Sequence, residues 1–315
     1  MKKIISTIGP KSIDLMPQLF QAGSNYFRDN LSHQNAEWHK NLMKKIQKEC
    51  PQVKVILDTK GPEIRIAKSN KKSVKSGSPL IIGKDIFFTV ENIHEYLNVQ
   101  DIIIIDAGTI ISSVEKIDGD KVHLHIQQGG KLEERQHVNI PGSQIPMNIL
   151  QDSDKSIIKK CSHFPIHAIA TSFTRTPEDI LEVRKFLDET GMKNTKIIAK
   201  IENKIAIKNL EKLIKVSDEI MIARGDLAME TNWFTLGETE KKILKTCKKH
   251  NQKCIVATEI LKSMITEKHP SRAEIIDMTL ALQSGASLMF SDETAIGNHP
   301  VKCIEVANTM MKYIQ

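Results

Sequence analysis

Charged and hydroxyl-bearing side chains follow six short runs of β-branched residues, at the points where strands would end. Lys200-Ile201-Glu202 ends one run, Arg224-Gly225-Asp226 follows the next, and Thr258 follows the one after that. Three more polar ends are Arg28-Asp29-Asn30-Leu31-Ser32-His33, Asp58-Thr59-Lys60 and Ser291-Asp292-Glu293-Thr294. A single polar strand end is an ordinary solvated loop, whereas six that converge at the carboxyl mouth of a sheet or barrel indicate a functional site.

These residue types suit metal-assisted chemistry on an anionic substrate. Glu202 and Asp226 could share a hard divalent cation, which prefers oxygen ligands and keeps waters for substrate oxygens. Lys200 could neutralise a transferring phosphoryl group or a developing enolate, and Arg28 adds a forked donor for phosphate. The alternative for Lys200 and Glu202 is a structural ion pair.

A turn that contains Gly225 adds a place for a substrate carboxylate. Glycine lets a backbone approach a ligand closely, and residues 227–230 could begin a short helix with free N–H groups. An ordinary tight turn is the alternative interpretation. If residues 28–32 stay extended, Arg28, Asn30 and Ser32 share one face.

An alternation of strands and helices would position these side chains. Strand-like runs and amphipathic stretches repeat as βα units, which is typical of a parallel sheet covered by helices. The expected strands are residues 3–6, 25–28, 53–57, 168–170, 196–200, 219–222, 254–257 and 288–290, with helices at 36–48 and from about 177, 271 and 300. Eight such strands predict the α/β class and a closed (β/α)₈ TIM barrel. Since no Gly-x-Gly-x-x-Gly follows the first strand, a dinucleotide fold is disfavoured.

The helical pattern disappears between about residues 66 and 139. Gly and Ser turns separate alternating runs there, and the stretch is too long for a loop between a strand and a helix. We therefore expect a small β domain at 66–139, inserted after the third strand of a barrel domain made of residues 1–65 and 140–315.

The amino-acid composition limits the kinds of binding partner and the cellular location that we expect. The formal charge is +7, but the lysines lie in helical stretches near acidic residues, and only 4% of residues are aromatic, so we expect no nucleic-acid partner. The longest apolar run, 102–105, is too short to span a membrane, and no signal-peptide core forms at the N-terminus. We expect a cytoplasmic protein. Five cysteines without a Cys-x-x-Cys pair indicate neither zinc nor a disulfide framework, and we expect them reduced and buried.

In order, these segments resemble the pyruvate kinase family along nearly the whole chain. The resemblance is carried by Ser6-Thr7-Ile8-Gly9-Pro10, Arg28-x-Asn30-x-Ser32-His33, Leu57-Asp58-Thr59-Lys60-Gly61-Pro62-Glu63-Ile64-Arg65, Val138-Asn139-Ile140-Pro141-Gly142, Ser172-Phe173, Ile198-Ala199-Lys200-Ile201-Glu202-Asn203, Met221-Ile222-Ala223-Arg224-Gly225-Asp226-Leu227, Ala257-Thr258, Ser271-Arg272-Ala273-Glu274 and Glu293-Thr294-Ala295.

The resemblance implies transfer of the phosphoryl group of phosphoenolpyruvate to ADP, followed by protonation of the enolate to pyruvate. It implies Mg²⁺ (or Mn²⁺) ligands at Glu202 and Asp226, a catalytic cation at Lys200, and Thr258 close to the protonation step. Gly225, Asp226 and Thr258 would bind the substrate. Residues 66–139 would be the mobile lid.

Further roles implied by the resemblance lie near the second and third strands. A K⁺ site would be formed by Asn30, Ser32, Asp58 and Thr59, and Glu63 is the residue type of potassium-dependent members. Phosphate and nucleotide contacts would come from Arg28, Asn30 and His33, with Arg28 also catalytic.

The chain departs from the family pattern near the ligands. Asp292 replaces a glycine, Glu259 stands where glutamine is common, and Asp29 stands where an apolar residue is expected. Extra carboxylates near polyanionic substrates repel them unless paired or metal-bound. Ala107 removes a lid carboxylate, and Gln136 replaces a lid lysine. Because the chain stops at Gln315, after the last barrel helix, we expect the family's C-terminal domain to be absent.

Three functions stay open. The first is a pyruvate-kinase-like phosphotransferase of glycolysis. The second is a divalent-metal enolate enzyme, such as a lyase, aldolase or decarboxylase, that acts on a pyruvate-like acid and has a degraded ADP/ATP site. The third is a non-catalytic binding or regulatory protein. A homo-oligomer held by barrel contacts is also an open alternative.

Overall fold

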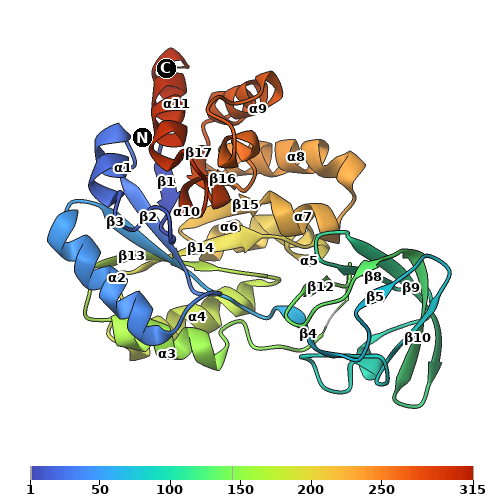
Figure 1. Ribbon diagram of the computed structural model, residues 1–315. Helices are drawn as coiled ribbons and strands as arrows, with labels where there is room; N and C mark the ends of the chain where they lie inside the picture. The colour runs from blue at the N-terminus through green and yellow to red at the C-terminus, as the bar shows by residue number, and fades with distance from the viewer. Residues whose placement is uncertain (1, 144, 315) are drawn as a thin grey trace.

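Parallel strands close into a barrel in the computed structural model, which describes residues 2–143 and 145–314 (Figure 1). Around the barrel the order is β1-β17-β16-β15-β14-β13-β3-β2, and all eight neighbouring pairs are parallel, so the sheet has no free edge. The strands are β1 (Ile4–Thr7), β2 (Tyr26–Asn30), β3 (Lys54–Asp58), β13 (Ile166–Thr171), β14 (Lys196–Ile201), β15 (Glu219–Ala223), β16 (Cys254–Ala257) and β17 (Ser287–Phe290). The predicted TIM barrel is confirmed.

Helices follow the strands and cover the barrel from outside (Figure 1). Several begin at polar caps: Asn35 accepts hydrogen bonds from two backbone N–H groups of α2, and Ser271 and Glu274 form a capping box at α9. The covering helices are α1 (Met16–Ala22), α2 (Ala36–Glu49), α3 (Asp152–Cys161), α4 (Pro177–Glu189), α6 (Leu210–Val216), α8 (Leu236–Lys249), α9 (Arg272–Gln283) and α11 (Pro300–Tyr313). Short helices at strand ends are α5 (Lys204–Lys208), α7 (Arg224–Glu230) and α10 (Asp292–Ala295).

A second, smaller barrel is inserted between β3 and α3 and lies beside α5 and α7 (Figure 1). It closes in the order β10-β6-β7-β4-β12-β8-β9 around its own apolar cluster. Its strands are β4 (Ile64–Ser69), β6 (Pro79–Ile82), β7 (Ile86–Phe88), β8 (Ile102–Ile105), β9 (Ile110–Asp118), β10 (Lys121–Gln128) and β12 (His137–Asn139), with a separate ribbon of β5 (Ser73–Val74) and β11 (Gly130–Lys131). Domain boundaries at 65/66 and 139/140 stay a prediction, and β4 already begins at Ile64.

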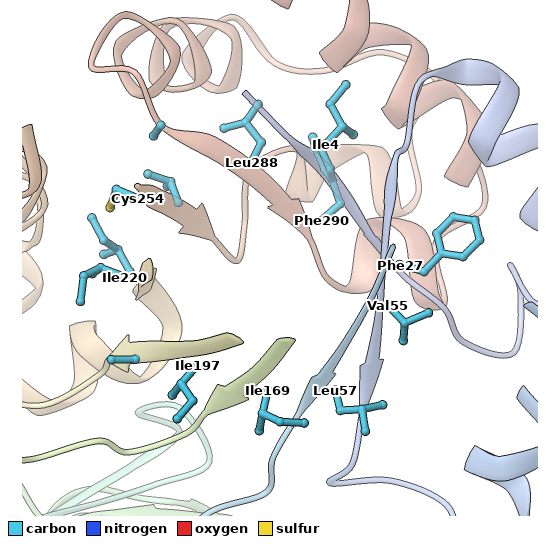
Figure 2. Packing of buried hydrophobic residues seen from close by; sticks show 14 of the residues in the cluster. Ile4, Phe27, Val55, Leu57, Ile169, Ile197, Ile220, Cys254, Leu288 and Phe290 are labelled. Atoms are coloured by element: carbon cyan, nitrogen blue, oxygen red, sulfur yellow. The ribbon is translucent and has the colours of Figure 1, made fainter. Parts of the chain in front are cut away.

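The barrel strands bury both faces because alternate side chains point to opposite sides. Outward residues pack against the helices, and Figure 2 shows several of them, among them Phe27, Leu57 and Ile220. Inward residues form a separate small cluster that includes Ile5, Ile198 and other buried side chains. The interior is therefore packed, as in other barrels of this class.

Two buried contacts between polar side chains connect different elements of the large barrel. Lys3 Nζ, before β1, donates to Glu219 Oε1 of β15 at 2.6 Å, and their side chains are 6% and 1% exposed. Burial lowers the pKa of Lys3, although Glu219 opposes this. In the second contact, His39 Nδ1 of α2 lies 2.9 Å from Asp29 Oδ1 of β2. Both pairs stabilise the barrel only while both partners are present.

Two other sequence-based expectations concern the whole chain. All five cysteines are buried and free, as expected. No helix within residues 2–143 and 145–314 is both long enough and apolar enough to cross a membrane.

Replacing Lys3 with methionine tests the ion pair at the amino end of the barrel. Lys3→Met leaves the Glu219 carboxylate buried without its cation, so we expect a loss of about 3–5 kcal/mol in the free energy of unfolding, measured in urea. The double variant Lys3→Met/Glu219→Leu should recover most of that loss. Lys302→Met removes a surface pair with Glu305 and serves as the control, for which we expect almost no change. A Lys3→Met protein as stable as the parent would contradict this role.

Candidate active site

Lys200 lies at the centre of the carboxyl mouth of the large barrel. Its Nζ is 3.0 Å from Glu202 Oε1, 3.1 Å from Asp58 Oδ1 and 2.6 Å from Ser172 Oγ. These partners follow or end β14, β3 and β13, so three neighbouring strands supply them. Burial lowers the pKa of Lys200, but the attraction of Asp58 and Glu202 outweighs burial and raises it above its ordinary value. Lys200 therefore stays an ammonium ion.

Asp58 contacts both Lys200 and a second cation, Arg28. Its Oδ2 accepts a hydrogen bond of 2.6 Å from Arg28 Nε, and Arg28 Nη1 also donates to Thr7 Oγ1 at 3.1 Å. Burial would raise the pKa of Asp58, but Lys200 and Arg28 reverse this and hold it below its usual value. The predicted forked donor, Arg28, is thus already held in place by Asp58.

Glu202 and Asp226 are close enough for the charge of one to affect the other. Burial raises the pKa of Glu202 above its usual value, Lys200 opposes this, and the negative charge of Asp226 adds to it. Glu202 Oε2 also accepts a 2.5 Å hydrogen bond from the backbone N–H of Phe173. The two carboxylates repel one another, and a cation between them would relieve this repulsion.

The inserted barrel reaches this mouth through β12. His137 Nδ1 lies 3.3 Å from Asp226 Oδ1, and Asn139 Nδ2 donates to Glu230 Oε1 at 3.3 Å and to Asp226 Oδ1 at 3.5 Å. Burial raises the pKa of Glu230 to about 7, with the Asn139 hydrogen bond opposing and Asp226 adding to the shift. The candidate metal ligand Asp226 is therefore oriented partly by the inserted barrel.

The helix after β15 begins earlier than the sequence indicates. α7 starts at Arg224, so Gly225 and Asp226 lie in its first turn, and Gly225 N–H donates to Thr258 Oγ1 at 3.0 Å. A Cβ at Gly225 would meet only Thr258 Oγ1, at 3.9 Å. The glycine is thus not needed for packing, and its missing side chain leaves open space beside the Thr258 hydroxyl.

Three non-glycine residues at the same mouth adopt a left-handed backbone conformation. Thr258 and Glu259 have φ of +70° and +53°, and Phe173 after β13 has φ of +55°. Such values are unfavourable for non-glycine residues, above all for a β-branched threonine, and cluster at functional sites. Arg224 Nη2 and Nε hold the Thr258 carbonyl at 2.8 and 3.1 Å. Arg224 is a positioning residue that fixes Thr258 in this conformation.

The remaining predicted residues near the second and third strands are only partly brought together. Asn30 pairs with Asp58 in the β2–β3 register, and Thr59 Oγ1 accepts a hydrogen bond from Ser172 N–H at 3.1 Å. Ser32 does not continue the strand, because its N–H donates to Asn30 Oδ1 at 3.2 Å and the chain turns there. The expected common face of Arg28, Asn30 and Ser32 on an extended chain is therefore wrong for Ser32.

His33 is exposed on the same turn. Partial desolvation of the ring, then repulsion by Arg28 and Arg65, lowers the pKa of His33. Glu63 lies nearby along the chain, but its carboxylate is held by Arg65 through two hydrogen bonds of 2.6 Å. His33 thus stays available at the mouth, whereas Glu63 is occupied.

Three carboxylates depart from the family pattern, Asp29, Glu259 and Asp292, and each lies in a different environment. Asp29 points outward to His39 and is buried there, so it does not face the mouth. Glu259 pairs with Lys262 on the surface. Asp292 is exposed at the start of α10, where its charge opposes the lowering of the His33 pKa. Only Asp292 therefore adds negative charge beside a predicted nucleotide contact.

Two further departures from the family pattern, Ala107 and Gln136, lie in the inserted barrel. Ala107 adopts φ of +51°, and Gln136 Nε2 donates to Asp106 Oδ2 at 3.3 Å. Gln136 thus fixes a neighbouring carboxylate of the small barrel and contributes no positive charge.

Several residues of the site had no role assigned from sequence. Ser172, Phe173 and Asn139 were recognisable only as parts of motifs, and His137 and Glu230 carried no signal. They act through contacts between segments that are far apart in the chain, which periodicity cannot show.

A metal would have two protein carboxylates here. Within residues 2–143 and 145–314, no group of three or more His, Cys, Asp or Glu side chains could hold a metal ion. Two carboxylates plus waters and substrate oxygens is the usual arrangement for Mg²⁺, so the donor set of Glu202 and Asp226 fits that ion.

Comparison with known proteins identifies the family of this chain. The family model described as "Pyruvate kinase, barrel domain" matches residues 1–304. Curated proteins named "Pyruvate kinase" from Bacillus licheniformis and Thermotoga maritima are each 33% identical over 98% of this chain, and one from Thermoplasma acidophilum is 32% identical over 99%. The chain spans 56%, 70% and 58% of the length of these relatives, respectively.

Replacing Glu230 with glutamine tests the buried carboxyl group under Asp226. A folded-state pKa of about 7, above the ordinary value of 4.5, costs stability as pH rises from about 4.5 through 7. Glu230→Gln removes this cost, so we expect it to gain about 2–4 kcal/mol relative to the parent between pH 4 and pH 8. Urea unfolding at both pH values measures this. Glu238→Gln, at an exposed site on α8, should show no such gain. Equal pH dependence of Glu230→Gln and the parent would refute the assignment.

Proposed function

Because this chain belongs to the pyruvate kinase family, we propose that it transfers the phosphoryl group of phosphoenolpyruvate to ADP, yielding pyruvate and ATP. The observation that carries the proposal is Lys200, a buried ammonium ion held beside Glu202 and Asp58 at the barrel mouth. The reaction belongs to glycolysis, and we place it in the cytoplasm.

Mg²⁺ or Mn²⁺ is proposed to bind Glu202 and Asp226. Burial, together with the negative charge of Asp226, raises the pKa of Glu202, and this raised pKa and the partial exposure of Asp226 support the proposal. When bound, a divalent cation offsets the charge on phosphoryl and enolate oxygens. Held by Phe173 N–H and by His137, respectively, the two carboxylates are already oriented before any ligand arrives.

The chain's own residues supply the rest of the mechanism. The first turn of α7 at Gly225 and the hydroxyl of Thr258 bind the substrate carboxylate beside the open space at Gly225. Lys200 Nζ neutralises charge on the transferring phosphoryl oxygens, and Arg28 assists from the side of Asp58. Thr258 Oγ1, next to this space, would relay a proton to the enolate.

We propose that K⁺ and ADP bind at the carboxyl ends of β2 and β3, next to this site. Oxygens of Asn30, Ser32, Asp58 and Thr59 would hold K⁺, a proposal supported by their proximity in the β2–β3 register and the turn after it. Arg28, Asn30 and His33 would contact ADP. Residues 66–139 would act as a lid over this mouth, supported by the contacts of His137 and Asn139 with α7.

One observation favours a second function. Asp292 places an exposed carboxylate near His33, on the side proposed for ADP. Its charge would repel a nucleoside diphosphate while leaving Glu202, Asp226 and Lys200 intact. The second candidate is therefore a metal-dependent lyase, aldolase or decarboxylase that acts on a pyruvate-like acid. Tight oxalate binding with Mg²⁺, without Mg²⁺-dependent ADP binding, would select it.

Pyruvate formation tests the first candidate directly. With phosphoenolpyruvate, ADP, Mg²⁺ and K⁺, we expect turnover, and Lys200→Met should lower kcat by at least about 100-fold because it removes a charge aimed at the transition state. Coupled NADH oxidation by lactate dehydrogenase measures the rate, and Glu238→Gln serves as the unaffected control. No turnover by the parent above background would sink the proposal.

Metal binding gives a separate test that needs no activity. Mn²⁺ at about 100 times its Kd should raise the free energy of unfolding of the parent by about 2.7 kcal/mol. Glu202→Gln should lose most of this stabilisation, because it removes one of two charged ligands, whereas Glu238→Gln should retain it. Urea unfolding with and without Mn²⁺ measures both. Undiminished stabilisation in Glu202→Gln would show that the ion binds elsewhere.

A further inference from the structure

The amino end of the large barrel carries a ring of inward-facing basic side chains. Ile4, Val55 and Ile197 point outward to the helices, as do Ile220 and Cys254 (Figure 2). Because successive side chains of an extended strand point to opposite faces, the residue before each of these points toward the barrel axis. These inward residues are Lys3, Lys54, Lys196, Glu219 and Lys253. Four lysines and one carboxylate therefore share the end of the barrel opposite the candidate active site.

The aromatic ring of Tyr26 fixes two of these lysines near the axis. Tyr26 belongs to the inward-facing apolar cluster, and the β2–β3 register pairs it with Lys54. The Nζ atoms of Lys3 and Lys54 lie over this ring, 4.8 Å and 5.5 Å from its centroid. Lys3 is also held at its backbone, since its N–H donates to Ser287 Oγ at 3.0 Å. Because the face of an aromatic ring attracts cations, two ammonium groups converge here.

Lys196 and Lys253 continue the ring on the neighbouring strands. Lys196 begins β14 and is paired with Ala168 of β13, another inward-facing residue. Lys253 directly precedes β16, and its carbonyl accepts a hydrogen bond of 3.0 Å from Ile220 N–H of β15. β14 and β16 lie on the two sides of β15, which begins with Glu219. The strand order of the barrel therefore places both lysines beside the carboxylate of the ring.

Positive charge exceeds negative charge in this ring. Its carboxylate, Glu219, accepts a hydrogen bond of 2.6 Å from Lys3 Nζ. The other three lysines form no salt bridge with a carboxylate in the part of the chain that the structure describes. Lys54 and Lys253 are exposed and Lys196 is half-buried, so a small ion can reach them from solvent. A concave surface lined by charges of one sign concentrates ions of the opposite sign.

A buried imidazole nitrogen beside this ring also lacks a partner. The ring centroids of His167, in β13, and Tyr26 are 5.3 Å apart. The Nε2 atom of His167 is buried and has no hydrogen-bond partner within residues 2–143 and 145–314. Desolvation, then repulsion by Lys3 and Lys54, lowers the pKa of His167 to about 4. The surroundings of the imidazole therefore disfavour further positive charge, and a buried unpaired nitrogen commonly has a water or an ion as its partner.

We propose that the amino end of the large barrel binds a small oxyanion of the phosphate class, free or as a phosphomonoester, between Lys3, Lys54, Lys196 and Lys253. Each ammonium group ends a flexible stem and offers several N–H donors, so lysines on different strands can reach one tetrahedral anion. The anion lies next to the His167 ring and offsets the surplus positive charge. The apolar cluster inside the barrel, which includes Ile5 and Ile198, separates this site from Lys200.

A titration of the full chain with inorganic phosphate tests the site. With isotope-labelled histidine, we expect the NMR signal of His167, assigned through His167→Gln, to shift and saturate as phosphate is added at constant ionic strength. Lys54→Met and Lys196→Met should each weaken this binding by about 10-fold, because each removes one attractive charge. Lys302→Met, at the surface pair with Glu305, should bind as the parent does.

A second ligand separates the two sources of the phosphate group. An equal response to glycerol phosphate shows that the site accepts phosphomonoesters, and a response to inorganic phosphate alone restricts it to the free ion. Circular dichroism confirms that each variant folds. Phosphate that shifts the His33 signal but not that of His167 is bound at the candidate active site, which would overturn the proposal. Parent-like affinity in both Lys54→Met and Lys196→Met, or no shift at all, would do the same.

Discussion

The mouth of the large barrel is organised around one buried cation, the Lys200 ammonium group, which is stable there only beside carboxylates. Removing an ammonium ion from water is costly, and the cost is offset here by carboxylates that would themselves be unstable without it. Lys200 therefore requires Asp58 and Glu202 to be within hydrogen-bonding distance, and Asp58 in turn immobilises Arg28. Since these residues come from β2, β3 and β14, the site forms only when the barrel closes in the correct register.

Much of the barrel could be predicted from sequence because its strands are short β-branched runs buried on both faces. The predicted strands agree with the observed ones to within about two residues, and Pro177 and Pro300 begin helices as expected. The i, i+2 spacing of Lys200 and Glu202 also placed both side chains on the inner face correctly, because alternation is a local rule.

What could not be predicted depends on contacts between distant segments or on local competition for hydrogen bonds. Ser172 meets Lys200, and Asn139 meets Glu230, only after the chain has folded. The Asn30 side chain captures the Ser32 N–H and ends the strand, which an alternating pattern does not reveal. From sequence, Asp29 was expected to add negative charge near the ligands. The sequence does not show that its side chain contacts His39, which lies ten residues later on a helix.

The two barrels differ in how far along the chain their closing strands lie. β1 pairs with β17, so the last hydrogen-bonded seam of the large barrel joins residues 4–6 to residues 288–290. The small barrel closes entirely within residues 64–139. During synthesis on a ribosome, the small barrel can complete its core while most of the large one still lacks its partners. Because Lys200 lies on β14, downstream of the whole small barrel, the contacts of Lys200 with Asp58 and Glu202 would then form after the small barrel has folded.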